Sequence, residues 1–155
     1  MNLFYLHKDP EVSATLHCDK HVVKMIIEYA QMLSTAHRIL DGSEYISQTL
    51  GGRRIKRWEH PISNMEGVLY KASHINHPST QWVRENAIQY QYAYDMFTAL
   101  CDEYTYRYKR VHLTDKKLRV SEEKSLLNQY ELDKNKKELI KIKEANEKLT
   151  DQVKE

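Results

Sequence analysis

Residues 17–40 contain neither glycine nor proline, and Asp41-Gly42 follows them. Glycine suits the left-handed position that ends many helices, so the pattern predicts one long helix over residues 17–38. Its apolar residues cover most of the helix circumference instead of forming a single stripe. A helix that is apolar nearly all round is mostly buried. We therefore predict that this helix is the centre of the fold.

The polar residues of this helix recur every three or four positions and form one line: His17, His21, Lys24, Glu28, Gln31, Thr35 and Arg38. On a buried helix such a line faces either a cleft or a satisfied internal network. We favour a cleft, where His21, Lys24 and Glu28 would form an acid–base site. The alternative is a salt-bridged network in which Lys24 and Glu28 make an i,i+4 pair.

Glycine and proline are scarce, with four and three copies among 155 residues, which disfavours a sheet protein with many tight turns. We predict an all-α fold, a compact single-domain helical bundle around the central helix. The two cysteines are far apart in sequence, as is typical of a reducing compartment. There is no apolar run of 18 residues, and the start of the chain lacks the order of a signal peptide. These features predict a cytoplasmic protein that does not enter a membrane.

The remaining chain divides by composition. We predict a helical catalytic domain over residues 1–118 and a charged C-terminal helix or tail over residues 119–155. Within the domain we expect a short helix at 10–16, a loop with short helical pieces at 43–75, and a second long helix from about 76 to 108 with an aromatic stripe. In the tail, heptad-like spacing from Leu139 to Val153 indicates either a weakly packed terminal helix or one used for self-association.

Four candidate metal ligands lie close together in sequence: His17, Cys18, Asp19 and His21. His17 and His21 are i,i+4 neighbours, but no His-Glu-x-x-His or paired Cys-x-x-Cys motif is present. We therefore predict no metal and no cofactor.

Nucleic-acid binding is indicated by a basic stretch, Gly51 to Trp58. It carries Arg53, Arg54, Lys56 and Arg57 beside Trp58. Cations grip phosphates, and an aromatic ring stacks on bases or wedges into a duplex. The alternative is a solvated basic loop with Trp58 folded into the core.

Trp82 and Arg84 raise the same question at the start of the second long helix. Arg84 would border the DNA-binding cleft, while Trp82 is more typical of a core residue. Lys20 and Arg38 are the other cations that we assign to DNA contacts.

Asp19-Lys20-His21, followed after six residues by Glu28, resembles the phage-type pyrimidine-dimer DNA glycosylases with AP-lyase activity. A weaker similarity extends along the second long helix, so the resemblance covers roughly residues 1–115. It implies a small all-helical enzyme, phage-encoded in a bacterial host, that binds and kinks damaged double-stranded DNA. A primary amine would attack the sugar C1′, displace the base and form a Schiff base, and β-elimination would then nick the strand.

The same resemblance makes Glu28 the catalytic carboxylate, but it leaves the nucleophile open. The family uses the α-amine of a small residue exposed by removal of methionine, whereas residue 2 is Asn here. We therefore expect Met1 to remain, and its α-amine and the amine of Lys24 are the two candidates. Two other hypotheses stand beside this one. The chain could be a helical enzyme acting on nucleotides or on modified phage DNA with Glu28 and His21 as acid and base, or a non-enzymatic DNA- or protein-binding module.

Overall fold

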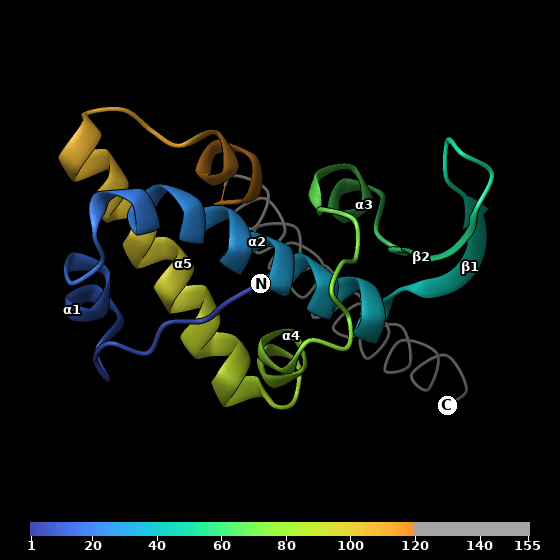
Figure 1. The fold of residues 1–155 in the computed structure, drawn as a ribbon, viewed down its shortest axis with the longest axis horizontal. Helices are drawn as coiled ribbons and strands as arrows, with labels where there is room; N and C mark the ends of the chain where they lie inside the picture. Colours follow the sequence, from blue (N-terminus) through green and yellow to red (C-terminus); the bar gives the residue numbers. More distant parts are fainter. Residues whose placement is uncertain (120–155) are drawn as a thin grey trace, which may run out of the picture. The chain divides into compact units, whose positions relative to one another are not determined.

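The computed structural model describes residues 1–119, and Figure 1 shows their arrangement. The elements in chain order are α1 (Pro10–Thr15), α2 (Asp19–Asp41), β1 (Ser43–Gln48), β2 (Arg54–Glu59), α3 (Ser63–Val68), α4 (Pro78–Val83) and α5 (Ala87–Tyr108). The fold is thus mostly helical but not all-α, because β1 and β2 form an antiparallel hairpin. The predicted helix at 10–16 is confirmed as α1, which Asp9 caps through its side chain.

The predicted central helix is confirmed as α2, which packs against α4 and α5. Its apolar side chains account for much of the core, with Val22, Ile26 and Tyr29 completely buried. The helix begins two residues later than predicted, because Cys18 is extended and serves as its N-cap. It ends at Asp41, where Gly42 follows in an extended conformation instead of the expected left-handed one.

The second long helix predicted from about residue 76 to 108 is in fact two helices, α4 and α5, with a break between Val83 and Ala87. The break has two local causes. Arg84 leaves helical geometry, and its guanidinium donates to the carbonyls of Thr80 and Ile75 at 3.2 and 2.7 Å. Asn86 then starts α5 as its N-cap, accepting from the backbone N–H of Gln89.

The segment 43–75, predicted as a loop with short helical pieces, contains the helix α3 but also the hairpin, which the sequence prediction missed. The strands pair in register from Ser43 opposite Glu59 to Gln48 opposite Arg54. A turn joins them, closed by a hydrogen bond from the Gly52 N–H to the Thr49 carbonyl at 2.8 Å. Gly52 has a φ of +78°, a conformation that glycine adopts without steric cost.

The first seven residues contain neither helix nor strand and lie on the core. Leu3 and Phe4 are partly buried and pack against the hydrophobic cluster, as does Met1. This placement brings the start of the chain to the middle of α2, as Figure 1 shows.

The predicted C-terminal helix or tail lies outside the described residues except for Arg119, and so does its predicted role in self-association. Within residues 1–119, none of the helices combines the length and apolar character needed to cross a membrane.

Candidate active site

The polar line of α2 divides into an accessible half and a buried half. His21 and Lys24 are exposed, while Thr35 and Arg38 are buried. Glu28 lies between the two halves, and only 12% of its side chain is accessible. The i,i+4 pair of Lys24 and Glu28, named above as the alternative, is present, and a separate internal network surrounds Arg38. The cleft at His21, Lys24 and Glu28 stays a prediction.

Glu28 meets the start of the chain. The backbone N–H of Asn2 donates to Glu28 Oε2 at 2.6 Å. On the other side, Lys24 Nζ lies 3.4 Å from Glu28 Oε1, and two thirds of the Lys24 side chain is exposed. The carboxylate thus lies between the first peptide unit and an ammonium group, which brings together three of the four predicted catalytic positions, Met1, Lys24 and Glu28.

His21, the fourth predicted catalytic residue, lies one turn before Lys24 on the same face. Its ring stacks on Phe4 of the N-terminal segment, with 5.0 Å between ring centroids. Phe4 also contacts the buried His17 edge-on. Burial lowers the pKa of His17 below its usual range, so this imidazole is neutral and its Nδ1 bonds the Ser13 carbonyl. His17 and His21 therefore hold the N-terminal segment on α2.

Asp19, the first residue of the Asp19-Lys20-His21 motif, has a structural role. Its carboxylate pairs with Arg107 near the end of α5 at 2.9 Å. The same guanidinium donates to the carbonyls of His17 and Thr15 and pairs with Glu103. This clamp fixes the beginning of α2 against α5. The sequence prediction missed Arg107, because a cation 88 positions away from its partner leaves no local signal.

Arg38 is 4% exposed and bound entirely within the protein. Its guanidinium pairs with Glu66 at 2.6 Å, and it also donates to the carbonyls of Trp58, Leu69 and Tyr70. Burial acts to raise the pKa of the Glu66 carboxyl, but hydrogen bonds from the His60 backbone N–H and the Arg38 guanidinium, together with the Arg38 charge, hold that pKa below its usual range. These contacts account for Arg38 as the anchor that joins α2, β2 and α3.

The other predicted DNA-binding residues differ in access. Lys20 is exposed at the start of α2, whereas Arg84 is half-buried and donates to two carbonyls of its own segment. Trp82, half-buried, contacts the ring of Tyr92 edge-on. It also lines a cavity of about 400 Å³ beside the N-terminal segment, together with Leu3, Tyr5, Pro78 and Ser79.

The basic stretch lies on the hairpin. Arg53, Arg54 and Lys56 are exposed on the turn and on β2, while Arg57 and Trp58 are half-buried and line a small polar cavity next to Arg38. Lys56 pairs with Glu44 across the strands at 2.9 Å. No carboxylate within residues 1–119 pairs with Arg53 or Arg54. The hairpin therefore carries two cations that are available to an anionic partner.

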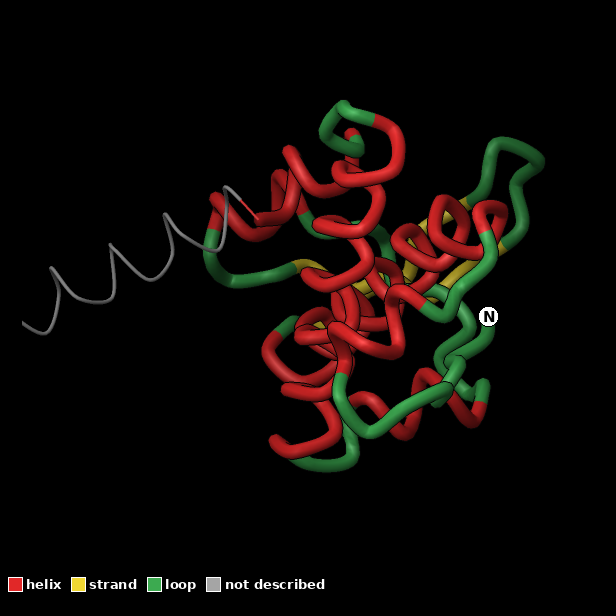
Figure 2. The backbone as a smooth tube through the Cα atoms, turned by 90° about the vertical axis from the view of Figure 1, so that its left-hand side faces the viewer, coloured by secondary structure: helices red, strands yellow, loops and turns green. Residues whose placement is uncertain are grey.

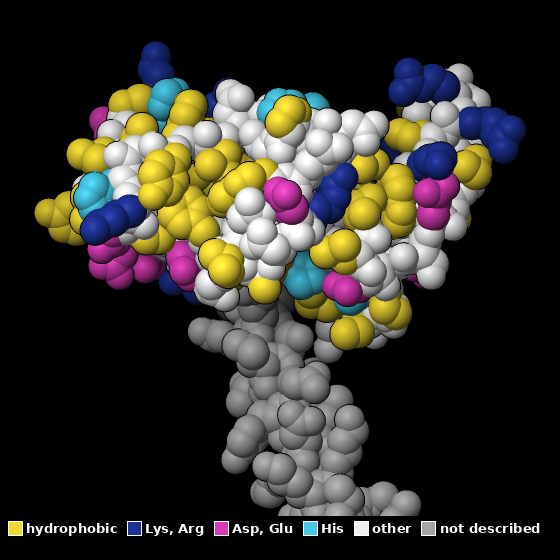
Figure 3. All heavy atoms as spheres, turned by 90° about the horizontal axis from the view of Figure 1, so that it is seen from below, with side chains coloured by type: hydrophobic (Ala, Val, Ile, Leu, Met, Phe, Trp, Pro, Cys, Tyr) yellow, Lys and Arg dark blue, Asp and Glu magenta, His cyan; other side chains and the backbone are white. Residues whose placement is uncertain are grey.

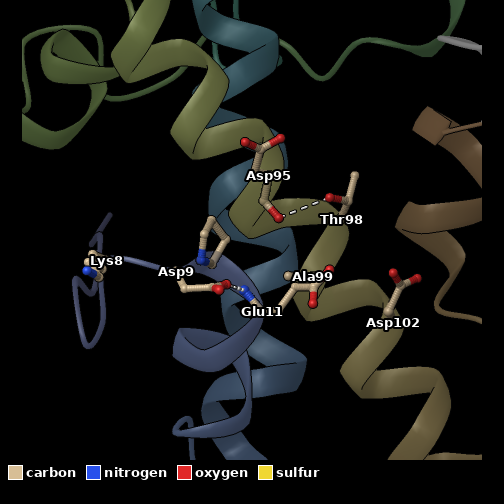
Figure 4. A pocket seen from close by; sticks show the side chains of 8 residues that line it. Lys8, Asp9, Glu11, Asp95, Thr98, Ala99 and Asp102 are labelled. Carbon is tan, nitrogen blue, oxygen red and sulfur yellow. Dashed lines mark hydrogen bonds between the residues drawn. The ribbon is translucent and has the colours of Figure 1, made fainter.

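A surface hollow of about 650 Å³ lies elsewhere, between α1 and α5. Figure 4 shows its lining, which includes the carboxylates of Asp9, Glu11, Asp95 and Asp102. Asp9 uses its carboxylate to cap α1, and Asp102 pairs with Arg119. So acidic a hollow repels phosphate groups, and it contains none of the predicted catalytic residues.

Within residues 1–119, His37, Asp41 and His60 could hold a metal ion, because their ligand atoms lie within 4.8 Å of one another. The hydrogen bonds oppose that use. The Ile62 N–H donates to His60 Nδ1 at 3.2 Å, which places the proton of a neutral His60 on Nε2, the atom that faces Asp41 at 3.8 Å. A protonated Nε2 is not a metal ligand. This trio is therefore better described as a carboxylate between two imidazoles.

The start of the chain is held against a shielded carboxylate, and an amine beside such a group can act as a nucleophile toward an electrophilic carbon. Comparison with known families agrees: residues 1–116 match the family described as pyrimidine dimer DNA glycosylase, and the chain belongs to that family. It is a DNA glycosylase and AP lyase acting on UV-damaged DNA. Neither the curated proteins nor the solved structures give a match.

Proposed function

We propose that the α-amine at the start of the chain is the nucleophile of this glycosylase/lyase and that Glu28 is its catalytic carboxylate. The observation that carries the proposal is the 2.6 Å hydrogen bond from the Asn2 N–H to Glu28 Oε2. It holds the beginning of the chain within one residue of a carboxylate that is largely shielded from water. Such positioning replaces a bimolecular encounter with an organised site.

The chemistry follows from the two groups. The neutral amine attacks C1′, the bond from C1′ to the base breaks, and the base leaves with its electron pair and takes up a proton. Glu28 accepts a proton from the amine and returns it to O4′ as the C1′–O4′ bond opens to the imine. Removal of a C2′ proton then expels the 3′-phosphate, and water releases the amine. No redox partner is needed.

Lys24 is the competing amine. It is mostly exposed and ion-paired with Glu28, so its geometry suits a cation that positions the carboxylate or meets a phosphate. As a class, α-amines also titrate about 2.5 pH units below lysine side chains, which leaves far more of the neutral form at physiological pH. We therefore assign Lys24 to binding.

The identity of the first residue affects the geometry in a definite way. With Met1 retained, the amine lies one residue before the atom that contacts Glu28. With Met1 removed, the Asn2 nitrogen that now donates to Glu28 would itself be the amine. Both forms keep an α-amine at this carboxylate, and the mass of the trapped peptide distinguishes them.

For the DNA interface we propose Lys20, Arg53, Arg54 and Lys56, the exposed cations among the predicted set. A cavity lined by Leu3, Tyr5 and Trp82 lies beside the N-terminal segment, and we propose that it receives an extruded base. Aromatic and apolar walls bind a flipped base by stacking.

Borohydride trapping on duplex DNA with an abasic site tests the nucleophile. We expect an adduct on the first residue of the chain, reduced on the order of a hundredfold or more in Glu28→Gln, which removes the proton acceptor at constant size. Lys24→Met is the matched control and should still trap. An adduct on Lys24, or undiminished trapping by a folded Glu28→Gln protein, would overturn the assignment.

A further inference from the structure

The hairpin is held firmly at its base and free at its tip. At the base, Arg38 donates to the Trp58 carbonyl at 2.8 Å, and Gly42 lies so close to the Arg38 and Glu59 carbonyls that a Cβ there would contact both. At the tip, Leu50 is fully exposed. The arm therefore has a fixed direction and a solvent-facing end.

Hydrogen bonds between Thr49 and Arg53 order the turn of the hairpin. Thr49 N–H donates to the Arg53 carbonyl at 2.9 Å, and the Arg53 N–H donates back to Thr49 Oγ1 at 3.1 Å. These bonds close the turn around Gly51-Gly52 and leave Leu50 protruding. From Thr49 to Arg57 the hairpin has four cations and no acid. Proteins that bind the DNA minor groove combine basic side chains with inserted apolar side chains, and this turn carries Leu50 followed by Arg53 and Arg54.

The arm lies well away from Glu28. Asp41 is the thirteenth residue after Glu28 on α2, which corresponds to about 20 Å along the helix. Strands of six residues extend up to about 20 Å further. The tip is thus roughly 25–40 Å from the carboxylate, close to the ~34 Å of one turn of B-DNA.

The arm and the chain start also lie on one face. In Figure 2 the hairpin turn and the N-terminus both lie toward the right-hand side of the molecule. In Figure 3 lysine and arginine side chains gather at the hairpin end. A straight duplex laid on this face would meet both features at once.

We infer that the hairpin is a DNA-binding arm that enters the minor groove about one helical turn to one side of the lesion. Leu50 lies in the groove, and Arg53 and Arg54 contact the phosphates on its edges. The protein therefore grips its substrate asymmetrically, with a long contact on one flank only. This inference rests on the proposed function, which places the lesion at Glu28.

Hydroxyl-radical footprinting tests it on a duplex of about 40 base pairs with a central tetrahydrofuran abasic analogue. This analogue cannot form an imine, so the footprint reports binding without turnover. We expect protection around the analogue and a second protected patch about ten base pairs away on one flank. Arg53→Ala/Arg54→Ala and Leu50→Ser should each lose only the second patch. The double variant should also lower the salt dependence of binding by about two phosphate contacts.

Lys8→Ala/Lys116→Ala removes the same charge from other exposed positions and should keep the second patch. A symmetric footprint, or a second patch that survives in Arg53→Ala/Arg54→Ala, would overturn the inference. Trapping on a true abasic site, run on the same preparations, reports separately on the proposed function. Successful trapping with a symmetric footprint would contradict only the inference that the hairpin is a DNA-binding arm. An asymmetric footprint without trapping would contradict only the assignment of the α-amine as nucleophile. Circular dichroism verifies that each variant is folded.

Discussion

Glu28 and Arg38 lie ten residues apart on one line of α2, and their surroundings give them opposite tasks. Arg38 is surrounded by carbonyl groups and a carboxylate, so its charge is neutralised inside the protein. Glu28 contacts one exposed cation, Lys24, and accepts a hydrogen bond from one backbone N–H, that of Asn2. A buried charge that has used all its partners stabilises the fold, whereas a partly accessible one can still react.

Arg38→Lys tests the scaffold role at the residue scale. Lysine keeps the charge but loses the planar fork, so several buried carbonyls lose their donors. We expect the free energy of unfolding in urea to fall by about 2–4 kcal/mol. Lys20→Ala is the surface counterpart and should change it by no more than about 0.5 kcal/mol. If the Arg38→Lys and parent proteins were equally stable, the scaffold role of Arg38 would be contradicted, and the sequence-based assignment of Arg38 to DNA contacts would have to be reconsidered.

At this scale the sequence predicted the motif but not all of its partners. The spacing of His21, Lys24 and Glu28 was enough to place them on one face. The sequence could not predict the contacts of Asn2 with Glu28 or of Arg107 with Asp19, because each joins segments that are distant in the chain. In addition, a backbone N–H has no sequence signature.

Among the elements, the junction of α2 and the hairpin is the most constrained. A Cβ on Gly42 would lie 2.3 Å from the Arg38 carbonyl oxygen and 2.9 Å from that of Glu59. Both are backbone atoms, which cannot turn aside as a side chain would. Glycine is therefore required here for close approach, and not for a left-handed φ.

Gly42→Ala should consequently destabilise the protein, by about 1–3 kcal/mol as in other overpacked sites. Gly51→Ala is the matched control, because a Cβ there meets nothing within 4 Å. Thermal unfolding of the two variants compares them directly. A Gly42→Ala protein as stable as Gly51→Ala would show that the hairpin shifts freely on α2, contrary to the fixed base on which the arm depends.

The elements were predictable in proportion to their regularity. The apolar periodicity of α2 extends over enough residues to specify a helix by itself, and the helix was predicted correctly. The hairpin went unrecognised because neither strand alternates apolar and polar residues. The two apolar residues of β1, Tyr45 and Ile46, are adjacent, and those of β2, Ile55 and Trp58, are three positions apart. The break before α5 was missed because Arg84-Glu85-Asn86 contains neither glycine nor proline, and the cap on Asn86 acts locally.

For the whole molecule, the family match ends at residue 116 and the compact unit ends at Arg119. Leu118, close to that end, is buried in the core. The chemistry that we propose uses only residues within this unit, and the catalytic domain over 1–118 stays a prediction.

A chain ending at Arg119 should therefore fold and trap abasic DNA within about threefold of the full chain, less than 1 kcal/mol in activation free energy. Borohydride trapping under single-turnover conditions measures this. A folded 1–119 chain that no longer traps would show that residues 120–155 contribute to the site, and would contradict the proposed division.

The contact between the first peptide unit and Glu28 also links the enzyme to its own biosynthesis. If the reactive amine is the chain's first nitrogen, a freshly made polypeptide with a formylated start has no nucleophile at all. Each molecule would become competent only when that nitrogen is a free amine. Any extension placed before Met1 would move the amine away from Glu28 and leave a protein that binds damaged DNA but does not cut it.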